Sequence, residues 1–233
     1  MLRTLEMVNF SSRFRDWLPG WLRGPLSFLF NERAPEPSKM KENQEEEMPE
    51  MPIPPNLLMP IAPPFVAPKY SPNFTPISRT RKIDLIVLHA TVGAFDGAVA
   101  WLCQKDRPNP TSAHYVISKK ADIVQLVADN DVAWHAGLAS WKGQGMVNMR
   151  SIGIELENGN TGKDRYPDEQ LAACLWLVLR ICKAHGIASE DIVGHADVAP
   201  GRKTDPAGFP WAEFRASAYY HLNSKSGEIL CKV

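Results

Sequence analysis

Two histidines in this sequence each follow a short run of branched apolar residues. His89 ends the run "IDLIVLH" (83–89), and His195 ends the run "DIVGH" (191–195). If these two predicted strands are neighbours, both imidazoles lie at the same edge of a sheet. Two imidazoles and one carboxylate form a common type of catalytic zinc site, which keeps one position open. The pair therefore predicts a metal centre, whereas the alternative for His89 is a hydrogen-bonded core histidine.

The best third ligand is a carboxylate in the turn-rich segment "GHADVAPGRKTDPAG" (194–208). Asp205 is followed by a proline, which favours an extended backbone at the aspartate. The Pro-Gly pair earlier in the segment is typical of a turn that would fold the loop back toward His195. Taken alone, Asp205 could simply open an ordinary turn. Histidines at two strand ends favour instead a Zn²⁺ site made of His89, His195 and Asp205.

Two further residues fit acid–base and electrostatic roles. Glu155 lies in "SIGIELEN" (151–158), whose alternation of apolar and polar residues predicts a strand with one polar face. It shares that face with Gly153, where the missing side chain leaves room for another group. Glu155 could act as general base and then as general acid, and Lys203 could stabilise an oxyanion. The alternatives are a solvent-facing strand residue and a surface lysine.

Four residues are candidates for a substrate pocket. Trp134 and His135 lie in the loop "AWHAG" (133–137), which joins an aromatic ring to an imidazole. His114 begins the strand "HYVIS" and faces either the pocket or the sheet, and Asn158 ends the motif "SIGIELEN". We expect these side chains to contact substrate rather than a metal ion.

The segments that must hold these residues alternate between strands and helices from about residue 79. Strands are predicted at 83–89, 151–158 and 191–195, and helices at 94–104 and 168–186. The runs "HYVIS" and "IVQLV" flank a polar turn and predict a hairpin. The fold class is therefore α/β.

Composition divides the chain into four parts. Residues 1–30 form an amphipathic aromatic segment, residues 31–78 a Pro/Glu-rich linker, residues 79–222 the folded domain and residues 223–233 a tail. We expect the N-terminal extension to be disordered, because its Pro/Glu-rich linker offers little apolar surface to bury. Its residues 9–30 favour either a helix on a membrane surface or a helix docked on the domain or on a partner.

Taken together and in this order, the motifs resemble the zinc-dependent N-acetylmuramoyl-L-alanine amidase family, whose type-2 amidase fold is shared with peptidoglycan recognition proteins. The resemblance runs from about residue 83 to residue 211 and is carried by "IVLHAT", "SAHYVIS", "AWHAG", "SIGIELEN" and "GHADVAPGRKTDPAG". It implies a central mixed sheet flanked by helices. It also implies hydrolysis of the amide between N-acetylmuramic acid and L-alanine of peptidoglycan or muropeptides.

The resemblance implies a role for each matched residue: zinc ligands at His89, His195 and Asp205, a catalytic glutamate at Glu155 and a transition-state lysine at Lys203. Ala113 stands where the phage-type enzymes have a catalytic tyrosine, so the chain is more similar to the enzymes of cell-wall recycling. The alternatives are a peptidoglycan-binding module without activity and a zinc hydrolase for another acyl group.

The charge balance and the hydropathy of the sequence limit the kinds of partner that we expect. The 26 basic and 26 acidic residues balance, which argues against a nucleic-acid partner. No apolar run approaches the roughly 18 residues of a membrane-spanning helix, and no secretory signal is recognised at the N-terminus. We therefore expect a monomer that is cytoplasmic or released as a lysin, with peptidoglycan or a muropeptide as its partner.

Overall fold

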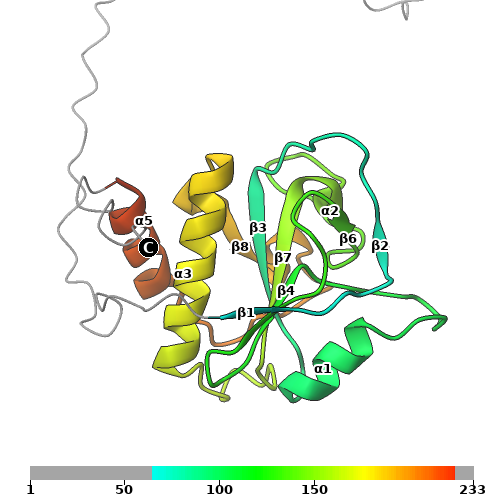
Figure 1. Cartoon of the computed structure of the whole chain (residues 1–233). Coiled ribbons are helices and arrows are strands. Elements are labelled where there is room, and N and C mark those ends of the chain that lie inside the picture. The colour runs from blue at the N-terminus through cyan, green and yellow to red at the C-terminus, as the bar shows by residue number, and fades with distance from the viewer. Residues whose placement is uncertain (1–64, 224–233) are drawn as a thin grey trace, which may run out of the picture. The chain divides into compact units, whose positions relative to one another are not determined.

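The computed structural model describes residues 65–223, which form a mixed β-sheet with helices packed against it (Figure 1). Its six strands are hydrogen-bonded in the order β1-β5-β4-β7-β3-β8. Their bounds are β1 Val66–Pro68, β3 Leu85–Ala90, β4 Tyr115–Ile117, β5 Ile123–Gln125, β7 Ser151–Leu156 and β8 Ile192–Gly194. Two shorter strands, β2 (Phe74–Thr75) and β6 (Val132–Ala133), pair with each other. The helices are α1 Phe95–Leu102, α2 Val147–Arg150, α3 Asp168–His185, α4 His195–Val198 and α5 Trp211–Asn223, with a 3-10 turn at Ser189–Asp191.

The pairing of the strands confirms the predicted α/β class with a mixed sheet. β4 and β5 form the expected antiparallel hairpin, while β3 runs parallel to β7 on one side and to β8 on the other. Every residue of β3 is buried, as expected for a central parallel strand covered on both faces. The carboxyl ends of β3 and β8 therefore lie at the same edge of the sheet, as the two strand-end histidines predicted.

One face of the central strands is entirely apolar. Alternate residues of β3 and β7, such as Ile86, Leu88, Ile152 and Ile154, belong to a core that includes buried residues of α3 and α5. Figure 1 shows these two helices on the same side of the sheet. Because side chains alternate along a strand, the other residues of β3 and β7 point to the opposite face. That face carries His89 and Glu155.

The local sequence of helix α3 explains where this helix begins and ends. Its buried residues recur at helical spacing, and its first turn carries Asp168 and Glu169 where acidic groups complement the helix dipole. The helix ends at Gly186, which adopts φ 68° and ψ 35°, a left-handed conformation that glycine takes without steric cost. The predicted boundaries of this helix are confirmed.

The predicted linker needs correction at its C-terminal end. Within the range 31–78, Val66–Pro68 forms β1 and pairs in parallel with β5. The next residues are also fixed, since Ser71 Oγ and Asn73 Nδ2 both donate to the carbonyl of Leu102 at the end of α1. A proline-rich segment can occupy this place because β1 is an edge strand, where a missing N–H is tolerated. The folded domain therefore begins before residue 79.

The remaining N-terminal predictions fall outside the described residues. The aromatic segment 1–30, the linker up to residue 64 and the residues after 223 stay predictions, including disorder and membrane contact. Across residues 65–223, no helix has the length and apolarity needed to cross a membrane.

Candidate active site

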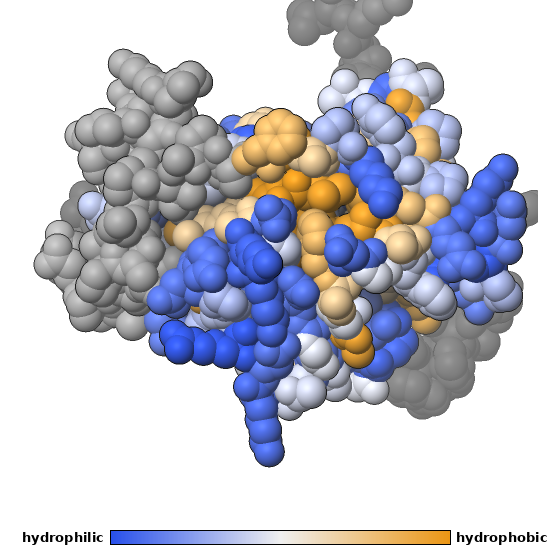
Figure 2. All heavy atoms as spheres, turned by 60° about the horizontal axis from the view of Figure 1, so that its bottom comes forward, coloured by the Kyte–Doolittle hydropathy of each residue, from blue (hydrophilic) through white to orange (hydrophobic). Residues whose placement is uncertain are grey.

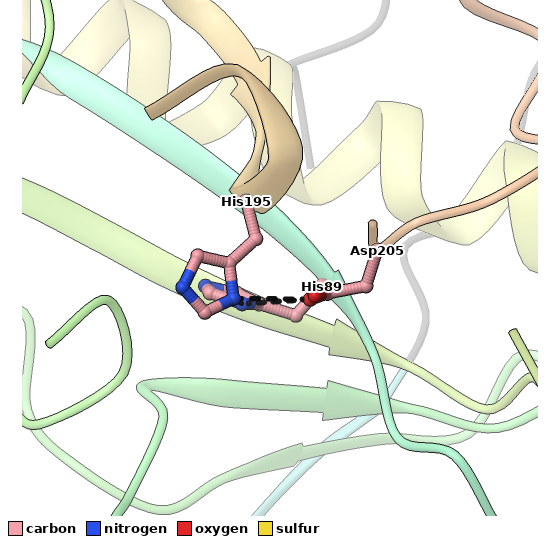
Figure 3. Close-up of side chains that lie close together, drawn as sticks. All are labelled: His89, His195 and Asp205. Atoms are coloured by element: carbon pink, nitrogen blue, oxygen red, sulfur yellow. Dashed lines mark hydrogen bonds and ion pairs between the residues drawn. The ribbon is translucent and has the colours of Figure 1, made fainter. Parts of the chain in front are cut away.

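Three buried polar side chains converge at the carboxyl edge of the sheet. His89 comes from the end of β3, His195 follows β8 directly, and Asp205 comes from the loop after α4 (Figure 3). The atoms that face one another are His89 Nδ1, His195 Nδ1 and Asp205 Oδ2. Their separations are 3.0 Å between the two nitrogens, 3.1 Å from His195 to Asp205 and 3.3 Å from His89 to Asp205.

This triangle has the dimensions of one face of a zinc coordination sphere. Ligand atoms about 2.0–2.1 Å from a tetrahedral zinc ion are roughly 3.3 Å from each other. All three residues are buried, and the donor set of two imidazoles and one carboxylate leaves a fourth position open in the manner of catalytic zinc sites. These residues therefore fit the zinc ion that the sequence predicts.

Hydrogen bonds behind the two imidazoles orient them. His195 Nε2 lies 3.2 Å from the carbonyl oxygen of Ala136, and this oxygen can only accept, so Nε2 carries a proton. His89 Nε2 lies 3.0 Å from Nδ1 of His135. Burial lowers the pKa of His89 to about 4, so the ring is neutral at pH 7. A neutral imidazole is the form that binds a metal.

Asp205 supplies the negative charge. Its side chain lies beside both imidazoles, with Oδ2 3.1 Å from His195 Nδ1 and 3.3 Å from His89 Nδ1. The loop is tied to α4 by a hydrogen bond from the backbone N–H of Ala196 to the carbonyl of Asp205, at 2.9 Å. Gly201 makes the turn with φ +74°. The turn that the Pro-Gly pair predicted is present.

Glu155 lies beside His89 on the adjacent strand, since the two residues are paired in the register of β3 and β7. Its atom Oε2 is buried and has no hydrogen-bond partner within the described residues. Burial and the negative charge of Asp205 raise the pKa of Glu155 to about 8. An unpartnered buried carboxylate is costly, and such groups are frequent where an acid or base acts. The strand has the predicted polar face, and because this face is the floor of the site, Glu155 is not the solvent-facing residue of the alternative interpretation.

Lys203 is an exposed residue of the same loop as Asp205. Its ammonium group acts on the site electrostatically: after burial and the charge of Asp205, it is the group that most affects Glu155, whose pKa it lowers. It also lowers the pKa of His89, as a smaller cause. The lysine therefore belongs to the electrostatic surroundings of the site.

A cavity of about 350 Å³ opens beside Glu155, lined by residues 91–94, one face of α1 and Glu155 itself. Two large apolar side chains of this lining are largely exposed, Val92 by 68% and Trp101 by 59%. Figure 2 shows apolar surface gathered between strongly hydrophilic projections on one face of the molecule. The cavity has the size of a small-ligand pocket and combines an apolar wall with a carboxylate.

The four predicted pocket residues have different positions. Trp134 is half-buried and donates from Nε1 to Thr75 Oγ1. His114 is fully buried and accepts a hydrogen bond from the N–H of Gly153 at Nδ1. Asn158 is also buried, and its side-chain amide bonds backbone groups of residues 160 and 164. His135 lies buried behind His89. Substrate contact stays a prediction for all four, and the hydrogen bonds of His114, Asn158 and His135 hold them within the protein.

Two buried polar residues near the site were absent from the sequence interpretation. Arg81 places its guanidinium against the backbone carbonyls of Asp129, Asn148 and Ser151. The hydroxyl of Ser151 contacts His135. Ser151 could have been found, because it shares the polar face of β7 with Gly153 and Glu155. Nothing in the local pattern marks Arg81 as buried.

Comparison with known proteins agrees with this geometry. Residues 79–208 match the family model for N-acetylmuramoyl-L-alanine amidase. The N-acetylmuramoyl-L-alanine amidase AmiD of Escherichia coli K12 is 36% identical over 147 residues, which are 57% of this chain and 52% of AmiD. The 1,6-anhydro-N-acetylmuramyl-L-alanine amidase AmpD of Citrobacter freundii is 40% identical over 106 residues, 45% of this chain and 56% of AmpD. The chain thus spans about half the length of these curated relatives.

Solved structures show the same fold. A crystal structure of a selenomethionine derivative of AmpD superposes with a TM-score of 0.59 and 31% identity, covering 67% of this chain and 95% of that one. The complex of E. coli AmiD with anhydro-N-acetylmuramic acid-L-Ala-D-gamma-Glu-L-Lys has a TM-score of 0.53 and 34% identity, covering 61% of this chain and 60% of AmiD. The family match covers more than half of the sequence and contains the converging histidines and aspartate. The chain therefore belongs to the N-acetylmuramoyl-L-alanine amidase family of type-2 amidases.

Proposed function

We propose that this chain is a zinc-dependent amidase that hydrolyses the amide bond between N-acetylmuramic acid and L-alanine in muropeptides. The observation that carries this proposal is the triangle of His89 Nδ1, His195 Nδ1 and Asp205 Oδ2, with separations of 3.0 to 3.3 Å. Membership in the amidase family supports the choice of bond.

The residues around the triangle supply the remaining chemistry. A zinc ion held by the three ligands would act as a Lewis acid that polarises the amide carbonyl and activates water. Glu155 takes a proton from the attacking water and returns it to the leaving nitrogen of L-alanine. A pKa near the working pH suits this shuttle, and burial moves the pKa of Glu155 to about 8. A bound cation would lower that value toward neutrality.

Lys203 provides positive charge for the oxyanion that develops on the carbonyl oxygen. A fixed ammonium group favours the transition state over the neutral amide, because negative charge exists only after attack. The exposed position of Lys203 leaves its ammonium group available to a substrate without the cost of full burial.

The cavity beside Glu155 supports a muropeptide as the substrate. Its apolar wall and its volume of about 350 Å³ suit part of a glycopeptide. The solved structure of the related AmiD is a complex with the substrate anhydro-N-acetylmuramic acid-L-Ala-D-gamma-Glu-L-Lys, which supports a compound of that class here.

The test is mass spectrometry of this anhydro-muropeptide after incubation with the purified full chain, with and without a zinc chelator. The expected result is free stem peptide beginning at L-alanine, formed only without chelator and restored by added Zn²⁺. Release of the peptide in the presence of the chelator would overturn zinc dependence.

The same assay separates the two other functions. An uncleaved muropeptide that still binds the zinc-loaded protein would indicate a binding module without activity. Equal cleavage of an acyl-L-alanine peptide that lacks the sugar would indicate a hydrolase for a different acyl group. Purified sacculi are assayed beside the soluble muropeptide. The two cleavage rates show whether intact wall or released fragments are the better substrate.

A further inference from the structure

Behind the predicted zinc ligand His89 lies a continuous line of buried hydrogen bonds. His89 Nε2 lies 3.0 Å from His135 Nδ1, and His135 Nε2 lies 3.1 Å from Ser151 Oγ. The hydroxyl of Ser151 donates to the carbonyl oxygen of Val147 at 2.6 Å. The side chains of His89, His135 and Ser151 are all buried, so water does not compete for these bonds.

The end of the line determines where each proton lies. The carbonyl of Val147 can only accept, so the single hydroxyl proton of Ser151 points to it. Ser151 Oγ must then accept from His135, which places the proton of the neutral His135 ring on Nε2. His135 Nδ1 is left as an acceptor, and His89 Nε2–H donates to it. The remaining nitrogen of His89, Nδ1, therefore has a free lone pair.

The backbone of β7 holds the ring of His135 in this position. A Cβ atom at Gly153 would lie 2.4 Å from Cγ of His135, much closer than real contacts allow. The ring of His135 fills the space that Gly153 leaves open, and it meets the ring of His89 edge-on with centroids 5.1 Å apart. The group that the missing side chain admits is thus an imidazole of the protein itself.

We infer that His135 is a positioning residue that holds His89 in its Nε2–H tautomer, with the Nδ1 lone pair directed toward Asp205 and His195. This inference rests on the proposed function in that the zinc ion would receive the lone pair. The ligand His195 obtains the same orientation from a backbone carbonyl, that of Ala136. Partners behind metal-bound histidines commonly fix tautomer and ring orientation. His135 accordingly acts through His89 and not by touching substrate.

The first experiment compares zinc affinity of full-chain variants by competition with a chromophoric chelator. His135→Phe keeps the ring but removes both nitrogens, and we expect it to weaken zinc binding about 10- to 100-fold. His135→Asn keeps an acceptor near the place of Nδ1, and we expect it to restore part of the affinity. A role in packing alone predicts the reverse order, because phenylalanine fills the space better than asparagine. Binding by His135→Phe as tight as wild type would overturn the inference.

The matched control is His221→Phe, the same exchange at a buried histidine of α5. We expect this variant to bind zinc like wild type, and thermal unfolding of each variant shows whether it folds. Ser151→Ala is a second variant in the line of buried hydrogen bonds, because it removes only the acceptor of His135 Nε2–H. Its expected effect on zinc affinity is smaller than that of His135→Phe.

The second experiment reads the tautomers directly in the zinc-free protein. Long-range ¹H–¹⁵N spectra of the histidine-labelled full chain show which ring nitrogen carries the proton. The expected result is Nε2–H for both His89 and His135, and a His89 ring without a proton on Nε2 would overturn the inference. Because this reading needs no metal, it decides the inference even if the wild-type chain fails to bind zinc, an outcome that would count against the proposed function instead.

Discussion

At the scale of single residues, Asp205 is the carboxylate of the proposed zinc site. As a carboxylate it would balance part of the charge of a divalent cation. Without it, two neutral nitrogens would have to hold the ion alone. The loss should exceed that caused by altering a residue behind a ligand, which is about 10- to 100-fold.

We therefore predict that Asp205→Ala lowers zinc affinity more than 100-fold, on the order-of-magnitude scale of metal-site variants, and abolishes peptide release. Asp168→Asn, at an exposed carboxylate of α3, is the control and should leave both unchanged. Metal analysis of the purified variants checks the prediction. Retention of one zinc per chain by Asp205→Ala would show that the ligand assignment is wrong.

Glu155 differs from the proposed ligands because it borders the cavity, and its atom Oε2 is buried without a hydrogen-bond partner among the described residues. Glu155→Gln preserves the size of the side chain but removes the proton shuttle. We predict that zinc binding stays at the wild-type level while turnover falls by about 10²–10⁴, the usual contribution of a general acid–base group. Single-turnover rates and metal content measured on the same sample check this. Glu169→Gln on exposed α3 surface is the matched control, and wild-type turnover in Glu155→Gln would remove Glu155 from the mechanism.

At the scale of elements, β7 has two functions at once. Its residues alternate between the apolar core under α3 and the floor of the site. The position of Gly153 on the second face leaves no space for a methyl group, because the ring of His135 occupies it. A small substitution in this strand should therefore change both the stability of the chain and its binding of zinc.

We predict that Gly153→Ala destabilises the chain by roughly 1–3 kcal/mol, as overpacked cores do, and weakens zinc binding by displacing His135. Gly97→Ala in α1 is the matched exchange, since a Cβ there meets nothing within 4 Å. In a helix this substitution stabilises by roughly 0.5–1 kcal/mol. Urea unfolding and zinc titration of both variants check the pair. Equal effects of the two substitutions would contradict the packing argument.

At the scale of the whole molecule, the site concentrates buried ionisable groups whose folded and unfolded pKa values differ. Burial lowers the pKa of His89 to about 4 and of His114 to about 3, and it lowers that of His135 well below its ordinary value. The folded state therefore binds fewer protons than the unfolded state below pH 6.5. The contribution of these histidines to the free energy of unfolding is lost as the pH falls from 6.5 toward 4. Glu155, raised to about 8, acts in the opposite direction, because its contribution is lost as the pH rises from about 4.5 to 8.

Between pH 6.5 and 4.5, the stability lost through the three histidines exceeds the stability gained through Glu155. We predict that the free energy of unfolding of the zinc-free chain falls on acidification, with a contribution from His89 alone on the order of 2 kcal/mol over this range. Urea unfolding with a chelator at pH 6.5, 5.5 and 4.5, followed by tryptophan fluorescence, checks the direction. A protein that becomes more stable over this range would contradict the burial of neutral histidines.

The sequence alone determined the features that depend on neighbouring residues. Alternation and helical spacing located the strands that end at His89 and His195, the strand of Glu155 and the helix capped by Gly186. The resemblance to the amidases then implied roles for Asp205 and Lys203. These features are local because side-chain periodicity and capping need only a few consecutive residues.

Only the tertiary structure decided which segments meet. The pairing of Leu88 with Gly194 and of His89 with Glu155 joins strands far apart in the chain, and no local pattern encodes such a register. The same holds for β1, which a proline-rich composition had assigned to the linker. It holds equally for His135, whose place behind His89 depends on a glycine in another strand. Local patterns carry no information about long-range contacts of this kind, because the free energy that selects them comes from burial and hydrogen bonding in the assembled core.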